Sequence, residues 1–168
     1  MRRNIIKCCY IGEHIQRFSN SYENKAYLSY QQKIENLIEK YIKNGVSYFV
    51  CGDMNNAELH FAETVLKFRE KYPNVELEID LAFREYPLRF TSADVKLHKR
   101  ILERADMLLF LFNQKDFHCK EERDYYIVDN ASHVIAVYNG LEEGTILSTI
   151  RYAKQQSKQV DFIDLASL

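Results

Sequence analysis

The sequence is poor in the residues that mark special architectures. Its 168 residues include no tryptophan, 2 prolines, 5 glycines and 4 cysteines. No apolar run approaches the roughly 18 residues that a membrane-spanning helix requires, so we expect no membrane partner. The segment Met1–Lys7 leads at once into a β-type run and lacks the long apolar core of a signal peptide. We therefore expect a cytoplasmic protein.

The cysteines do not form a metal-binding or redox pattern. No Cys-x-x-Cys pair exists, which argues against a zinc ribbon and a thioredoxin-like site. We expect Cys8, Cys9, Cys51 and Cys119 to be reduced thiols that pack as small hydrophobic groups. A metal site or a reactive thiol at Cys119, beside His118, is the alternative, but no further ligands stand at a suitable spacing. The sequence predicts no metal site and no cofactor.

The charges are balanced and the apolar content is ordinary. The chain has 23 Lys and Arg against 24 Asp and Glu, for a net charge of −1. A general nucleic-acid-binding protein needs a basic face, so we do not expect one here, although a local basic groove stays open. With 46% hydrophobic and 13% aromatic residues, the chain can form one core, and we expect a single domain over residues 1–168.

Apolar β-type segments alternate with helical patterns along the whole chain. The expected strands are 5–12, 46–52, 75–81, 107–112, 134–138 and 160–165, and the expected helices are 26–44, 57–71, 93–104, 121–130 and one that begins at residue 145. This alternation predicts an α/β fold, with a mostly parallel sheet of five to six strands and helices on both faces. The alternating segment 75–81 is typical of a strand near a sheet edge.

The few glycines concentrate after strands. Gly45 ends a helix, whereas Gly12, Gly52, Gly140 and Gly144 follow expected strands. The carboxyl ends of parallel strands share one edge of the sheet, where ligands bind, and glycine allows the backbone to approach a ligand closely. The alternative is that turns between strands and helices simply favour glycine. None of these loops matches a Gly-x-Gly-x-x-Gly or P-loop pattern.

The clearest ligand candidate is the loop before the last helix. Gly144 and Thr145 open that helix, whose N-terminal N–H groups and dipole favour an anion. The alternative is an ordinary turn capped by Thr145. Asp53 is a candidate for binding a ribose hydroxyl, His14 for a ligand hydrogen bond, and Arg123 for a bidentate phosphate contact. For Arg123 the alternative is a surface salt bridge with Glu121, Glu122 or Asp124.

Four motifs resemble those of a known family. Residues 12–14, Gly-Glu-His, stand where that family has Thr-Gly-His-Arg. Residues 52–63 resemble its glycine-rich loop, with Glu58 at an acidic position, and residues 123–129 resemble Arg-Asn-Arg-Tyr-Met-Val-Asp. Residues 136–153 resemble Tyr-x-Gly…Gly-Gly-Thr…Thr…Tyr-Ala. On these motifs the chain resembles the YpsA-like branch of the SLOG superfamily, related to LOG phosphoribohydrolases and DprA.

This resemblance implies a Rossmann-like three-layer αβα fold that binds a nucleotide-like small molecule at the strand carboxyl ends, as a sensor or regulator. For many members of the family no activity is assigned. The chain departs from the motifs at Glu143, which replaces a glycine, and at His14 and Tyr125, which stand where the family has arginines. Two cationic groups are lost and a carboxylate is added, so the pocket suits a less anionic ligand, or none.

Two alternatives stay open. LOG enzymes cleave an N-glycosidic bond with an Arg and a Glu, so the resemblance allows a hydrolase with Glu58, Glu142 or Glu143 as the carboxylate. The LOG glutamate that follows Gly-Gly-Thr has no match here, and whether the protein is an enzyme stays open. The other alternative is a homo-oligomeric interaction module without a ligand, whose pocket is filled by Glu142, Glu143 or Tyr125.

Overall fold

The computed structural model describes residues 5–12, 15, 24–53, 55–81, 90–112, 119–138 and 144–168. Six strands form one sheet, and every strand pairing in it is parallel. The strands are β1 (Lys7–Gly12), β2 (Tyr48–Cys51), β3 (Glu76–Leu81), β4 (Met107–Phe110), β5 (His133–Tyr138) and β6 (Gln159–Asp164). Their order across the sheet is β4-β3-β2-β1-β5-β6.

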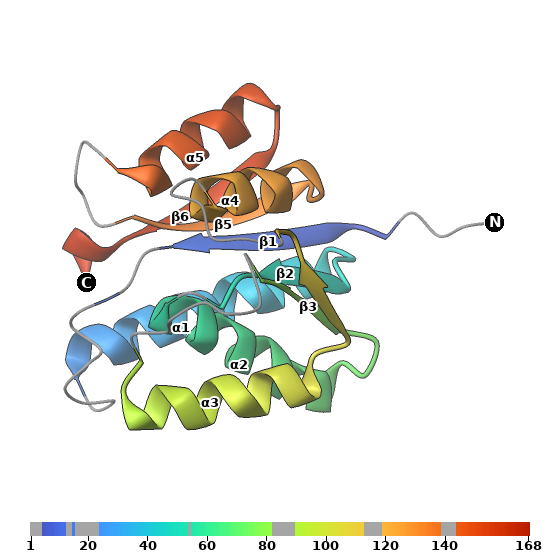
Figure 1. The fold of residues 1–168 in the computed structure, drawn as a ribbon, viewed down its shortest axis with the longest axis vertical. Helices are drawn as coiled ribbons and strands as arrows, with labels where there is room; N and C mark the ends of the chain where they lie inside the picture. Colours follow the sequence, from blue (N-terminus) through green and yellow to red (C-terminus); the bar gives the residue numbers. More distant parts are fainter. Residues whose placement is uncertain are drawn as a thin grey trace.

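The helices cover both faces of this sheet, as Figure 1 shows. On one face lie α1 (Lys25–Lys43), α2 (Asn56–Lys71) and α3 (Ser92–Arg104). On the other lie α4 (Cys119–Asp129) and α5 (Thr145–Gln155), and a short 3₁₀ helix, Leu165–Ser167, follows β6. The predicted α/β class and the Rossmann-like three-layer arrangement are confirmed. No helix among the described residues is long and apolar enough to cross a membrane.

The helix boundaries follow the local sequence signals. In α1 one stripe is buried, formed by Tyr27, Tyr30, Ile34, Ile38 and Tyr41, whose spacing of three and four residues places them on one face. The Asn24 side chain accepts a hydrogen bond from the Ala26 N–H at the start, and Gly45, with φ of +93°, follows Asn44 at the end.

The sheet separates two hydrophobic clusters. The larger one fills the space between the sheet and α1, α2 and α3, and there the rings of Tyr10 and Phe61 stack with centroids 4.6 Å apart. The smaller one joins the sheet to α4 and α5 through residues such as Val134 and Ile150. The central strands β1 and β5 contribute to both clusters, which explains their nearly continuous apolar sequences.

The prediction that segment 75–81 lies near a sheet edge is confirmed, because β3 is the strand next to the edge strand β4. β3 pairs with β2 on one side and with β4 on the other, so it lies inside the sheet. Its sequence alternates because Leu77 and Ile79 belong to the larger cluster, whereas Glu78 and Asp80 point to the α4 face. The edge strand on this side of the sheet is β4, and its side chains Met107, Leu108 and Phe110 are exposed.

The described cysteines are buried thiols, as expected. Cys8, Cys9 and Cys51 are free and fully buried, and burial raises the pKa of each thiol above its ordinary value. They lie on the central strands β1 and β2, where they pack as small apolar groups. The side chain of Cys119 and the whole of His118 lie outside the described residues.

Candidate functional site

The strand order reverses between β1 and β5, and a ligand is expected at the carboxyl ends of these strands. Gly12 ends β1 and pairs with Val137 of β5. Its carbonyl oxygen accepts a hydrogen bond of 2.8 Å from the Asn55 side chain, which lies before α2. The Asn56 side chain also bonds both backbone groups of Ile15, at 2.9 and 3.0 Å. The chain that leaves β1 is therefore attached to the start of α2.

The N-terminus of α2 is satisfied by its own side chains. Asn55 and Glu58 form a capping box, in which the Glu58 N–H donates to the Asn55 side chain at 3.0 Å. In return, the Asn55 N–H donates to Oε2 of Glu58 at 3.2 Å. This arrangement occupies donors that would otherwise point to a ligand and places a carboxylate beside them. The start of α2 is therefore a poor anion site.

Arg123 is buried at the centre of the site. Its side chain is fully buried, and its Nη2 lies 2.5 Å from Oε1 of Glu58 and 2.8 Å from Oδ1 of Asp124. Burial alone would lower the pKa of Arg123, but the two carboxylates more than offset this and the pKa is raised. Burial raises the pKa of Glu58, against the attraction of the guanidinium. The ion pair with Asp124 is thus buried and not at the surface, and a phosphate contact by Arg123 stays a prediction.

The arginine also explains the glycine that follows β2. A Cβ atom at Gly52 would overlap the guanidinium group of Arg123. The backbone of Gly52 therefore lies directly against Arg123, so only a residue without a side chain fits at this position. A ligand contact at Gly52 stays a prediction, since the packing of Arg123 already requires the glycine.

Asp53 is engaged by another helix. Its Oδ2 lies 2.7 Å from Nε2 of His98 on α3, and the side chain is almost fully buried. His98 also packs against the ring of Phe90, with centroids 5.5 Å apart. The contact between Asp53 and His98 thus attaches the end of β2 to α3, which is a structural role for both side chains. A role for Asp53 in ribose binding stays a prediction.

The start of α5 differs from that of α2. Its N-cap is Gly144, with φ of +129°, and the cap makes no side-chain hydrogen bond. Thr145 is therefore the first residue of the helix and not its cap, so the capping alternative is wrong. The Thr145 carbonyl accepts hydrogen bonds from the hydroxyl groups of Ser148 and Thr149, at 2.9 and 2.7 Å. Without a capping side chain, the first N–H groups of α5 suit an external anion.

A lysine that the sequence analysis did not select lies at this helix start. The Nζ of Lys120, on α4, is 3.5 Å from Oγ1 of Thr145 and 3.1 Å from Oδ2 of Asp124. Glu121 lies nearby, with Oε1 3.5 Å from the Ser148 hydroxyl and 2.8 Å from that of Tyr125. The spacing of four residues between Lys120 and Asp124 is a sequence signal for their ion pair on α4, but not for the contact of Lys120 with Thr145.

Several predicted site residues cannot be placed. His14, Gly140, Glu142 and Glu143 lie outside the described residues. Tyr125 is described, and its ring packs against Tyr152 of α5 with centroids 4.5 Å apart. In the described part of the chain, no group of three or more potential metal ligands comes together.

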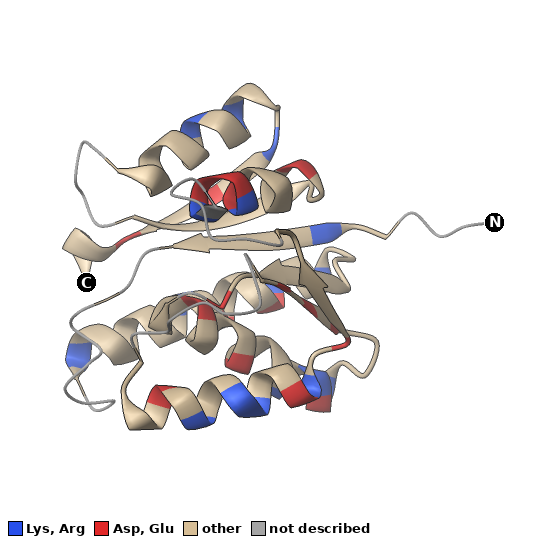
Figure 2. Cartoon of the chain, viewed as in Figure 1, with Lys and Arg blue, Asp and Glu red and all other residues tan. Residues whose placement is uncertain are grey.

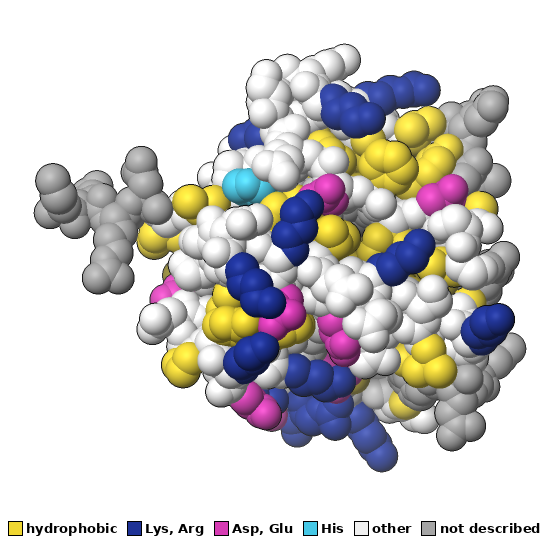
Figure 3. Space-filling view, turned by 180° about the vertical axis from the view of Figure 1, so that it is seen from behind, with side chains coloured by type: hydrophobic (Ala, Val, Ile, Leu, Met, Phe, Trp, Pro, Cys, Tyr) yellow, Lys and Arg dark blue, Asp and Glu magenta, His cyan; other side chains and the backbone are white. Residues whose placement is uncertain are grey.

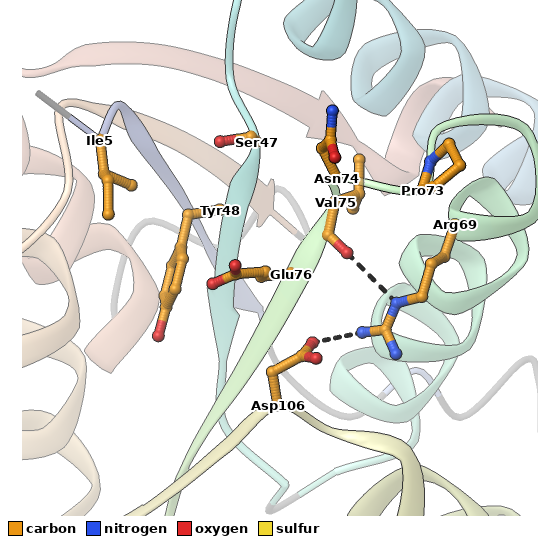
Figure 4. A pocket seen from close by; sticks show the side chains of 9 residues that line it. All are labelled: Ile5, Ser47, Tyr48, Arg69, Pro73, Asn74, Val75, Glu76 and Asp106. Atoms are coloured by element: carbon orange, nitrogen blue, oxygen red, sulfur yellow. Dashed lines mark hydrogen bonds and ion pairs between the residues drawn. The ribbon is translucent and has the colours of Figure 1, made fainter. Parts of the chain in front are cut away.

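The hollow drawn in Figure 4 lies at the opposite edge of the sheet. Its volume is about 380 Å³, and residues at the amino ends of β2 and β3, such as Tyr48 and Glu76, line it. Arg69 crosses it and donates to the Val75 carbonyl at 3.2 Å and to the carboxylate of Asp106. These charged groups neutralise one another. The hollow is far from the loops that carry the predicted site, and it does not resemble a ligand pocket.

The charges of the described residues are mixed in sign. Both basic and acidic residues lie along α3, as Figure 2 shows. Seen from behind, in Figure 3, the apolar side chains form separate areas between charged and polar ones. A uniform basic face, of the kind that tracks a nucleic-acid backbone, is not present on the views of the described residues.

The chain was compared with known proteins. It is similar to a UPF0398 protein of Halalkalibacterium halodurans, with 24% identity over 157 residues, which cover 89% of this chain and 79% of that protein. Its fold is similar to that of DNA processing protein A from Helicobacter pylori, a protein described for its unique single-stranded DNA binding mode. The TM-score is 0.59 with 18% identity, and the match covers 94% of this chain but 64% of that one. The chain thus spans less than two thirds of that structure.

A family model also matches nearly the whole chain. It is the YpsA model, described as the YspA SLOG family, and it matches residues 13–168. This range includes the capping box of α2, the buried Arg123 and the start of α5. The predicted resemblance is confirmed, and the chain belongs to the YpsA family of SLOG proteins.

Proposed function

We propose that this protein binds a nucleotide or a nucleotide-derived small molecule and acts as a ligand sensor or regulator. The observation that carries the proposal is the start of α5, where Gly144 provides no capping side chain and Lys120 reaches within 3.5 Å of the Thr145 hydroxyl. Backbone N–H groups and an ammonium group together suit a phosphate. Glu121 beside the same turn limits the negative charge that the site can accept.

The location supports this proposal. α5 follows β5, one of the two strands between which the strand order reverses, and crevices at such points bind ligands in open α/β sheets. Membership of a SLOG family is consistent with a nucleotide-like ligand. The start of α2 is already capped, so α5 is the better anion site.

A thermal-shift experiment tests this function. Wild-type protein is measured with AMP, GMP, cyclic AMP, NAD and ADP-ribose. A ligand at about 100 times its dissociation constant stabilises by about 2.7 kcal/mol, which corresponds to a rise in Tm of roughly 5–10 °C for a chain of this size. Absence of stabilisation by every compound contradicts the proposal. A short single-stranded DNA is added because the Helicobacter pylori protein binds such DNA, and stabilisation by DNA alone would favour that ligand class.

A variant locates the phosphate. Lys120→Gln removes the ammonium group but keeps most of the side chain, and we expect about tenfold weaker binding because a charge-assisted hydrogen bond is lost. Lys96→Gln, at an exposed position of α3 on the other face of the sheet, is the matched control and leaves the affinity unchanged. Equal affinities for both variants would place the phosphate elsewhere.

Cleavage of an N-glycosidic bond is less well supported. Glu58, the described candidate carboxylate, bonds Arg123 with one oxygen and the Asn55 N–H with the other. A group engaged in this way stabilises the structure and is poorly placed to support an oxocarbenium ion. Long incubation with the same nucleotides, followed by chromatography, tests this conclusion. Release of free base by wild type, but not by Glu58→Gln, would reverse it.

A further inference from the structure

The two edges of the sheet are protected differently. β6, at one edge, carries two carboxylates, and charged side chains discourage an edge strand from pairing with another chain. Asp161 of β6 accepts hydrogen bonds from Lys40 and Tyr41 of α1, and the Lys154 ammonium lies over the Phe162 ring. β4, at the other edge, has the sequence Met-Leu-Leu-Phe, without charge, proline or glycine. It therefore lacks the features that keep an edge strand unpaired.

The backbone of β4 can accept a further strand. The Leu111 N–H donates to the Leu81 carbonyl at 3.0 Å, so alternate residues, Leu111, Leu109 and Met107, bond toward β3. Leu108 lies between them, and its N–H and C=O point away from β3. In the described part of the chain, no strand pairs with this outer side of β4. Outward-directed backbone groups of this kind are a template for strand pairing.

Apolar side chains extend the edge on both faces of the sheet. Met107 pairs in register with Glu78, which points to the α4 face, and Met107 is 49% exposed. Tyr126 of α4 is 40% exposed. Burial first, and then the carboxylates of Asp80 and Glu78, raise the pKa of Tyr126, so its ring lies beside β3 on the same face. Leu108, which is 38% exposed, points to the opposite face.

A second copy of the same strand suits this edge. A twofold axis places β4 antiparallel to β4, so apolar residues face apolar residues and no like charges meet. The nearest preceding charge, Asp106, is paired with Arg69 of its own chain. Pairing of β4 with β6 of another copy would instead bring the carboxylates of Asp161 and Asp164 to the contact and would generate an open filament.

The exposed area predicts a weak association. Side chains of this size have roughly 150–250 Å² of surface, so Met107, Leu108 and Tyr126 together expose on the order of 250 Å² in each copy. Two copies supply about 500 Å², to which the strand backbone adds, against roughly 1,200–2,000 Å² for a stable interface. We therefore expect a reversible dimer with a Kd on the order of 10–100 µM.

We propose that β4 pairs with β4 of a second copy, in a twofold-symmetric dimer that joins the two sheets into one. Leu108 then faces Leu108 of the second copy, and each N–H donates to the carbonyl of the other. The dimer forms without a ligand, so nucleotide binding and dimer formation can each fail alone.

Sedimentation equilibrium at about 5–500 µM protein tests the dimer, since this range brackets the expected Kd. Leu108→Lys places an ammonium group at the centre of the contact, opposite its own copy, and we expect association at least tenfold weaker. Phe162→Lys makes the same change in charge at an exposed position of β6 and should leave the equilibrium unchanged. Circular dichroism checks that both variants are folded.

A cysteine variant reports the contact directly. The Cα atoms of a hydrogen-bonded antiparallel pair lie about 5.5 Å apart, within reach of a disulfide. Oxidation of Leu108→Cys with diamide should convert most of the protein into a covalent dimer, whereas Phe162→Cys and wild type should form at least tenfold less.

Wild type that stays monomeric at about 500 µM overturns the inference, since the expected Kd lies well below that concentration. Association that Leu108→Lys leaves unchanged also overturns it, because the dimer would then use another surface. If Leu108→Lys does not fold, the cross-linking decides: a yield from Leu108→Cys no higher than from Phe162→Cys overturns the pairing of β4 with itself.

Discussion

Replacing Asp80 with asparagine should stabilise the protein without ligand, and the gain should grow with pH. Burial first, and the Glu78 carboxylate second, raise the pKa of Asp80 from the ordinary 3.8 to about 8. Because the folded state holds the proton more tightly than the unfolded chain, the free energy of unfolding falls as the pH rises from about 4 to about 8. The slope is about 1.4 kcal/mol per pH unit, so the loss at pH 7 is on the order of 4 kcal/mol.

Urea denaturation of wild type and Asp80→Asn at pH 5, 6, 7 and 8 measures this difference. The 12 tyrosines and the helix signal in circular dichroism provide the readouts, since the chain has no tryptophan. Asparagine cannot ionise, so its advantage in the free energy of unfolding should increase at each step up to about pH 8. The exposed Glu76 on the same strand provides the control Glu76→Gln, with no such trend. A difference that is constant with pH, or that shrinks as pH rises, would contradict a raised pKa of Asp80 in the folded protein.

Three further predictions concern the packing around Arg123. Gly52→Ala should lower the free energy of unfolding, measured by urea denaturation, by about 3 kcal/mol, because the new methyl group meets the guanidinium of Arg123. Its control is Gly45→Ala, where the methyl group faces open space, and only the positive φ should lower the free energy of unfolding, by about 1 kcal/mol. Arg123→Met should lower the free energy of unfolding by about 3–5 kcal/mol, since Glu58 would be left buried without its partner, and a loss below 1 kcal/mol would contradict the buried pair. Asn55→Ala should lower the free energy of unfolding by about 1–2 kcal/mol, because the capping box of α2 is lost. An unchanged Tm would contradict a stabilising role of this capping box.

The sequence was sufficient for the fold because its periodicity is local. The apolar run Val134–Tyr138 predicts a buried strand, and the apolar stripe of α1 predicts a helix. Because strands and helices alternate along the chain, few sheet topologies are possible. The alternating polar residues of β3 indicated a position near the edge of the sheet, and β3 does lie beside the edge strand β4. In the structure those residues lie on the face that α4 covers and not at a free edge.

The site was harder to predict because its contacts join distant segments. Glu58 and Arg123 are 65 residues apart, and no sequence pattern predicts that these two charged side chains are buried against each other. Gly52 was correctly selected as a place of close approach, but the approaching group is the side chain of Arg123. Lys120 was overlooked because its importance depends on the start of α5, which only the tertiary structure brings near.

The ion pair of Glu58 and Arg123 joins α2 and α4, which cover opposite faces of the sheet. It passes over the end of β2 and so links the two hydrophobic clusters that the sheet otherwise separates. Such a contact forms only when both layers are in place, late in folding, because closing a 65-residue separation must come first. Amide hydrogens in the first turns of α2 and α4 should therefore exchange together, through the same global opening, and the two faces of the molecule should not unfold one at a time.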